Sequence, residues 1–74
     1  MDFKDKLRTI RAVRDVTQGQ LAAGLGLNPS IIGKLETGDV RPSQDLEARI
    51  REALDWGRAE DAALEMLNGE RLPA

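Results

Sequence analysis

The chain contains neither cysteine nor histidine, so its 74 residues cannot be held together by disulfides or by a zinc cluster with thiolate and imidazole ligands. A chain of this length buries only about 60% of the surface of its unfolded state, which limits it to one small core. Its stability must therefore come from packed side chains, helped by a partner chain where one binds. We expect a single domain over residues 1–69, a short tail over residues 70–74, and no metal or other cofactor.

The amino-acid composition favours helices over strands. Phe3 and Trp56 are the only aromatic residues, whereas leucine, alanine, arginine and glutamate are frequent. The apolar runs are far shorter than the ~18 residues that span a bilayer, and the first residues lack the basic and apolar segments of a signal peptide. We expect an all-α cytoplasmic protein that does not enter membranes.

The residue types also argue against an enzyme. The chain has no histidine or cysteine to act as a base or nucleophile, no phosphate-binding glycine loop, and too few residues to enclose a pocket. Its carboxylates are scattered as they are on ordinary solvated helix faces. We therefore expect a protein that acts by binding.

Apolar residues spaced three and four apart predict a first helix over residues 2–14. Its apolar stripe consists of Phe3, Leu7, Ile10 and either Val13 or Arg14. Basic side chains occupy the other face, and residues 1–38 carry a net charge of +2 against −4 for residues 39–74. This asymmetry indicates that the first half faces a polyanion, although ordinary solvated helix faces would give the same pattern.

Capping residues predict two further helices within residues 17–38. A capping box, in which a hydroxyl and a glutamine side chain each bind the other's backbone, marks the start of the second helix. An Asn-Pro pair marks the start of the third helix, and a glycine suited to the left-handed conformation ends each of the two. The residues concerned are Thr17 with Gln20, Gly26, Asn28 with Pro29, and Gly38.

Two more helices are predicted in the second half of the chain. Ser43 caps a fourth helix over residues 43–54, and Trp56 interrupts the pattern before a last helix over residues 58–67, which an Asn-Gly pair ends. The positions expected to face the core in these helices are Leu46, Ile50, Ala53, Leu54, Ala63, Leu64 and Leu67.

Residues 16–38 fit two helices that cross at a steep angle. Such a crossing needs a small residue where the helices meet, a turn residue that tolerates positive φ, and inward apolar anchors on the second helix. These residues are Ala22, Gly26, Ile32 and Leu35. Together with the capping box and the motif Glu36-x-Gly38, they make the chain resemble the Cro and repressor (XRE) family of helix-turn-helix domains over about residues 5–56.

The resemblance implies a five-helix, lambda-repressor-like fold whose helix-turn-helix core lies at residues 17–38. It further implies a regulator that binds an operator in double-stranded DNA as a homodimer, in the nucleoid of a prokaryote or of a virus-infected prokaryote. The helix over residues 29–36 would enter the major groove. Its base-facing residues would be Pro29, Ser30, Ile31, Gly33 and Lys34, and contacts to phosphate or the minor groove would come from Arg11, Arg14, Thr17, Gln18, Asn28 and Arg41.

Several of these positions have two interpretations. Lys34 can reach guanine O6 or N7, or a phosphate, and Ile31 can meet a thymine methyl group or cap the core. Gly33 either allows a close approach to DNA or is a glycine that the helix tolerates. In a helix interior, glycine is ~1 kcal/mol less stable than alanine. Because Pro29 and Ser30 offer few hydrogen bonds, specificity would also rest on backbone approach, water or DNA shape.

The resemblance also implies an ion pair. Arg11 and Glu36 match an arginine and a glutamate that members of this family pair between the first helix and the end of the recognition helix. Such a pair is mainly structural, and breaking a partly buried pair from one side costs ~3 kcal/mol. Arg41 is either a DNA contact or a solvated loop charge.

The last helix offers a candidate dimer surface, because Ala59, Ala62 and Met66 remain apolar outside its core stripe. Two-fold pairing would set the recognition helices ~34–36 Å apart, which is the spacing of adjacent major grooves. The alternative is an ordinary exposed stretch without a partner.

Two other functions fit the same residues. The helix-turn-helix is also similar to that of multiprotein bridging factors, which are transcriptional coactivators, and the acidic total charge agrees with a protein-binding role. The remaining alternative is the DNA-binding part of an antitoxin that represses its own operon and holds a toxin through the segment from Arg58. Protein partners would then be a polymerase, a coactivator target or a toxin.

Overall fold

The computed structural model describes residues 1–70, with side chains through Leu67, and this part of the chain forms five α-helices and no strand. They are α1 (Phe3–Val13), α2 (Gln18–Leu25), α3 (Pro29–Thr37), α4 (Gln44–Ala53) and α5 (Arg58–Glu70). The predicted all-α fold of five helices is confirmed. The predicted end of α5 is wrong, because the helix continues through Asn68 and Gly69. Residues 71–74 of the expected tail lie outside the described residues.

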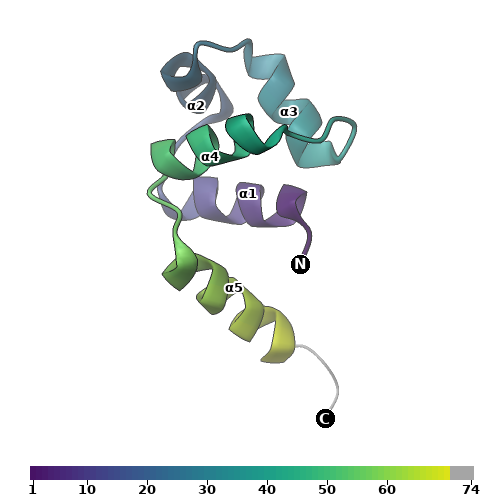
Figure 1. The fold of residues 1–74 in the computed structure, drawn as a ribbon, viewed down its shortest axis with the longest axis vertical. Coiled ribbons are helices and arrows are strands. Elements are labelled where there is room, and N and C mark those ends of the chain that lie inside the picture. The colour runs from purple at the N-terminus through teal and green to yellow at the C-terminus, as the bar shows by residue number, and fades with distance from the viewer. Residues whose placement is uncertain (71–74) are drawn as a thin grey trace.

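The five helices form an elongated molecule (Figure 1). α2 and α3 lie at one end, α1 and α4 cross the middle, and α5 forms the other end. α2 packs against α3 and α4, whereas α1 packs against α3 and α5. Among the described residues, no helix is both long and apolar enough to cross a membrane.

The predicted capping residues start α2, α3 and α4. Gln20 N donates to Thr17 Oγ1 at 3.0 Å and Thr17 N donates to Gln20 Oε1 at 2.9 Å, which completes the capping box. Asn28 Oδ1 accepts from Ser30 N at 3.1 Å, and the Ser43 hydroxyl caps the first turn of α4 in the same way. Each cap satisfies a backbone N–H that the helix itself leaves unpaired.

The helices end in two different ways. Gly26 and Gly38 end α2 and α3 in the left-handed conformation, with φ of 70° and 86°, as their positions predict. After α1 and α4, however, Asp15 and Asp55 occupy the same region, with φ of 56° and 50°. Aspartate adopts this conformation at a cost that glycine avoids. Surrounding contacts must therefore hold the two chain reversals before α2 and α5.

The core draws side chains from all five helices. Its buried apolar residues are Leu7, Ile10, Leu21, Ala22, Leu25, Ile32, Leu35, Ile50, Leu54, Trp56 and Leu64. The predictions for Val13 and Leu67 are wrong, since 67% and 52% of their surfaces are exposed. Val13 lies where α1 ends, and Leu67 lies beyond the part of α5 that reaches the core. Ala53 and Ala63 are exposed as well.

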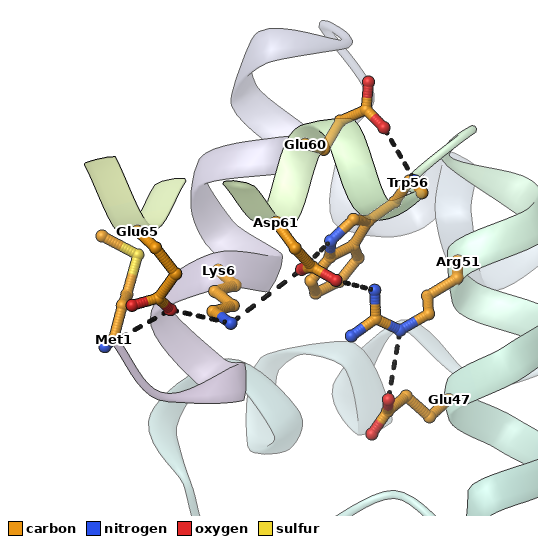
Figure 2. Close-up of polar contacts among 9 residues, drawn as sticks. Met1, Lys6, Glu47, Arg51, Trp56, Glu60, Asp61 and Glu65 are labelled. Atoms are coloured by element: carbon orange, nitrogen blue, oxygen red, sulfur yellow. Dashed lines mark hydrogen bonds and ion pairs between the residues drawn. The ribbon is translucent and has the colours of Figure 1, made fainter. Parts of the chain in front are cut away.

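Trp56 is a core residue with only 3% of its surface exposed. Its ring stacks on Phe3 with centroids 5.4 Å apart, and the Arg51 guanidinium lies 4.4 Å from the ring centre. Trp56 Nε1 also donates to Asp61 Oδ1 at 2.8 Å. Figure 2 shows the Asp61 carboxylate between the indole and Arg51. The chain between α4 and α5 is thus packed against the start of α1.

Charged side chains complete the attachment of α5 (Figure 2). Asp61 Oδ2 accepts from Arg51 Nη1 at 3.0 Å, and Lys6 Nζ lies 3.1 Å from Glu65 Oε1 and 3.9 Å from Asp61 Oδ1. Burial alone would raise the pKa of Asp61, but the hydrogen bonds from Trp56 and Arg51 outweigh burial and hold that pKa below its ordinary value. α5 is therefore joined to α1 and α4 by polar as well as apolar contacts.

Candidate nucleic-acid interface

A tight turn sets the angle between α2 and α3. The left-handed conformation of Gly26 lets Leu27 N donate to Ala22 O at 2.9 Å, which closes the end of α2. Ala22 is fully buried, and Ile32 and Leu35 of α3 are buried as well. The opposite side of α3 is left at the surface.

The residues predicted to face bases lie on this exposed side of α3, with one exception. Pro29, Ser30 and Lys34 are exposed, and Gly33 is half-buried. Ile31 is also half-buried and packs against the core. This packing agrees with the core-capping interpretation of Ile31, and its contact to a thymine methyl group stays a prediction.

Glu36 is a buried charge beneath this surface, with 5% of its area exposed. Its Oε2 accepts from Arg11 Nε at 2.7 Å, and its Oε1 accepts from Arg11 Nη2 and from Gln18 Nε2, each at 3.1 Å. The pair implied for Arg11 and Glu36 is present. It also includes Gln18, which the sequence did not indicate, so one carboxylate joins α1, α2 and α3.

The partners of Glu36 set its charge state. Burial alone would raise the pKa of this carboxyl, but the hydrogen bonds from Arg11 and Gln18, together with the charge of Arg11, hold the pKa below its ordinary value. The hydrogen bond to Glu36 in turn raises the pKa of Arg11. Glu36 is therefore a carboxylate at neutral pH and acts only as a hydrogen-bond acceptor.

The Gln18 side chain lies next to Gly33 of α3. A Cβ atom added at residue 33 would meet Gln18 Nε2 and Oε1 at 3.9 Å each, which is ordinary van der Waals contact. The fold therefore does not require a glycine at residue 33, and an alanine fits there without displacing the amide.

Gly33→Ala should raise the free energy of unfolding by up to about 1 kcal/mol, because alanine restricts the unfolded chain and suits a helix interior. Gly24 of α2 provides the matched control, since it is exposed and a Cβ there would meet nothing within 4 Å. Gly24→Ala should stabilise the protein by a similar amount. Urea denaturation followed by circular dichroism measures both changes. Destabilisation by Gly33→Ala alone would show that the contact with Gln18 tolerates no side chain.

Two of the arginines predicted to contact phosphate are occupied within the protein. Arg14 donates to the carbonyl oxygens of Leu54 and Asp55, at 2.9 and 2.8 Å, where α4 ends. A guanidinium at the carboxyl end of a helix also interacts favourably with the helix dipole. Arg11 is held by Glu36. We therefore leave Arg14 out of the proposed DNA contacts and regard Arg11 as mainly structural.

Few groups remain available to a polyanion on this side of the molecule. Lys34 and Arg41 are exposed, and their side chains make no ion pair with the described residues. The oxygens of Thr17 and Asn28 are used in capping, which leaves the hydroxyl hydrogen and the amide group as donors. Gln18 is half-buried and keeps one amide hydrogen beyond its bond to the carboxylate.

The residues predicted for a dimer surface are all exposed on α5. Ala59, Ala62 and Met66 lie at the surface, and 67% of the area of Met66 is accessible. The exposed Leu67 follows Met66, whereas Leu64 is buried against the core. α5 therefore has one apolar side chain in the core and further apolar side chains in solvent.

A family model matches most of the chain. Residues 3–64 match the family described as a helix-turn-helix domain, a range that includes α1 to α4 and part of α5. Comparison with curated proteins and with solved structures gives no significant match. The matched range contains the capping box, the turn at Gly26 and the buried Glu36, and a helix-turn-helix indicates a DNA-binding domain. The chain therefore belongs to the helix-turn-helix domain family.

Proposed function

We propose that the chain is a sequence-specific transcriptional regulator of the Cro and repressor type, which binds an operator as a homodimer. The observation that carries this proposal is the exposed side of α3, with Pro29, Ser30 and Lys34 beside the capped start of α2. The buried Glu36 fixes the two helices relative to each other. A rigid pair of this kind presents one helix to base edges while the other contacts the DNA backbone.

The residues have different roles in this proposal. Lys34 is the long donor on the exposed side of α3, so we assign it to guanine O6 or N7, with Ser30 as a second reader. Gly33 allows the helix to approach the groove closely. Phosphate contacts come from Gln18 and Arg41, supported by the donor groups of Thr17 and Asn28.

The homodimer in this proposal forms through α5. A two-fold interface brings the same patch of both protomers together, and the exposed Ala59, Ala62 and Met66 form such a patch. Alanine lets two helices come close, and methionine adapts its shape to the opposing surface. The location of α5 at the end of the molecule opposite α2 and α3 keeps this patch clear of the DNA-facing residues (Figure 1).

Selection of bound sequences from a random pool of DNA duplexes, at low and at moderate salt, tests the proposal. We expect an inverted repeat whose half-sites lie about one helical turn apart. Binding should weaken with salt, because each phosphate contact made by a cation such as Arg41 adds about −0.9 to the slope of log affinity against log salt. Recovery of no common motif would overturn the proposal.

Lys34→Ala should weaken binding to the selected operator by ~1–3 kcal/mol and relax the preference at one position of each half-site. Arg58→Ala is the matched control, because it removes the same charge from an exposed position on α5. Its operator affinity should stay close to that of the wild-type protein in a titration followed by fluorescence anisotropy. An equal loss on all sequences with Lys34→Ala would assign Lys34 to a phosphate instead.

The scarcity of free basic groups favours a second candidate, an adaptor of the multiprotein-bridging-factor type. With Arg11 and Arg14 occupied and a net charge of −2, the chain has few groups for phosphate. An adaptor would yield no motif in the selection and would bind protein without competition from DNA. In the antitoxin alternative the protein also binds an operator, but α5 binds a toxin. This alternative therefore predicts DNA binding together with a different protein bound to α5.

A further inference from the structure

The Gln18 side chain does not move freely at the proposed DNA interface. Its Nε2 donates to Glu36 Oε1 at 3.1 Å, and the same oxygen accepts from Arg11 Nη2 at 3.1 Å. Only 4% of the Glu36 side chain is accessible, so this carboxylate cannot itself contact DNA. The contact therefore links a buried charge to a half-buried amide at the start of α2.

The chemistry of this contact fixes which way the amide points. A carboxylate only accepts hydrogen bonds, so Gln18 must turn its NH2 group toward Glu36. A rotation of the amide by 180° would place its carbonyl oxygen against the carboxylate and lose the bond. The amide also lies beside Gly33 of α3, since a Cβ atom added at residue 33 would be 3.9 Å from both Nε2 and Oε1.

We propose that Glu36 is a positioning residue for the DNA interface, which sets the orientation in which the Gln18 amide meets the DNA backbone. The inference rests on the proposed function and deepens it, because it gives Glu36 a role in recognition in addition to joining the helices. A side chain that is already oriented loses less conformational freedom when it binds. We expect this orientation to contribute about three- to tenfold in affinity.

A double-mutant cycle on operator affinity tests the coupling. Glu36→Gln keeps the size of the side chain but can present either an acceptor or a donor, so the Gln18 amide is no longer oriented. Glu36→Gln and Gln18→Ala should each weaken operator binding about three- to tenfold, and the double variant should bind no worse than Gln18→Ala alone. Arg58→Ala, on the exposed surface of α5, leaves Gln18, Glu36 and Arg11 in place and should retain operator affinity. Losses that multiply in the double variant would overturn the positioning role.

A second measurement needs neither a variant nor DNA. In the wild-type protein the side-chain NH2 group of Gln18 should exchange its hydrogens with water more slowly than that of Gln44, which is exposed at the start of α4 and makes no side-chain hydrogen bond among the described residues. Nuclear magnetic resonance of the side-chain amides measures both rates. Equal exchange in the two residues would overturn the proposal even if Glu36→Gln fails to fold.

The two measurements separate this inference from the proposed function. If the wild-type protein binds no duplex, the proposed function and the positioning role both fail. If it selects an operator but the double-mutant cycle shows independent effects, the positioning role fails and the proposed function stands. Coupled affinities together with slow exchange at Gln18 support both.

Discussion

Arg11→Met is expected to lower the free energy of unfolding by about 3–5 kcal/mol at neutral pH. The substitution leaves the Glu36 carboxylate, 5% exposed, with Gln18 as its remaining hydrogen-bond partner among the described residues. A buried charge without a counter-charge destabilises the fold, because it has lost its hydration and gains too few hydrogen bonds and ion pairs in exchange. A domain of this length has a total stability of roughly 4–11 kcal/mol, so the variant lies close to unfolding. Urea denaturation followed by circular dichroism measures the loss.

Arg8→Met is the matched control on the same helix. Arg8 pairs with Asp5 at the surface, where such pairs contribute at most about 1 kcal/mol. Equal losses in the two variants would show that the burial of Glu36 is not the cause. The double variant Arg11→Met/Glu36→Leu should recover much of the stability, because it removes the buried charge together with its partner.

The pH dependence of stability should change sign between the wild-type protein and Arg11→Met. In the wild-type protein the pKa of Glu36 lies below the ordinary glutamate value of about 4.3. The pair of Arg11 and Glu36 therefore makes its full contribution to the free energy of unfolding above that pH. This contribution is lost as the pH falls through the lower pKa of Glu36 in the folded state. In the variant, burial without the guanidinium should raise this pKa, so protonation relieves the penalty. The difference in stability between the two proteins should be largest at neutral pH and shrink in acid.

Both ends of α2 and α3 and the start of α4 could be predicted because their signals are local. Thr17, Asn28 and Ser43 cap the helices that their positions indicate, and Gly26 and Gly38 end α2 and α3. Each of these signals depends on backbone groups within one turn of the residue itself. Local sequence therefore suffices to specify them.

The role of Arg14 could not be predicted in the same way, and the role of Arg11 is indicated only by the resemblance, which implies its pair with Glu36. Arg11 and Arg14 carry the same charge within one turn of α1, and the sequence pattern places both on a face that meets a polyanion. Their partners, the Glu36 carboxylate and the Leu54 carbonyl, come from segments far along the chain. A charge pattern shows where cations are but not which of them the fold uses, so it overstates the charge available to DNA.

The burial of Trp56 shows the same limit in the core. The helical pattern stops at this residue, which is why the sequence indicates only an interruption. Its partners Phe3 and Asp61 meet because α5 packs back against α1, a tertiary arrangement that no local signal specifies. One local signal was available, since Gly57 and Glu60 have the spacing of a helix cap, and Gly57 N donates to Glu60 Oε1 at 2.7 Å.

The second large effect is expected for Trp56→Ala, which should cost about 3–5 kcal/mol and loosen α5 more than the rest of the protein. The substitution removes the ring that stacks on Phe3 and lies against Arg51, together with the donor to Asp61. Leu64 is then the remaining buried apolar side chain of α5 in the described part of the chain. Polar contacts at the surface compensate poorly for this loss, because solvent screens them.

Two other variants and a local measurement separate the contributions. Trp56→Phe keeps a ring against Phe3 but loses the bond to Asp61, so its cost should be nearer 1 kcal/mol. Met66→Ala, on the exposed side of α5, should change stability by less than about 0.5 kcal/mol.

Amide hydrogen exchange should show faster exchange along α5 in Trp56→Ala, while α2 and α3 keep more of their protection. Uniform loss of protection would show that α5 does not open separately.

Because α5 carries the proposed dimer surface, a variant with loosened α5 should occupy operator half-sites independently. The contacts of Trp56 would then control how two protomers combine on DNA, although this residue is buried in the core and does not belong to α3.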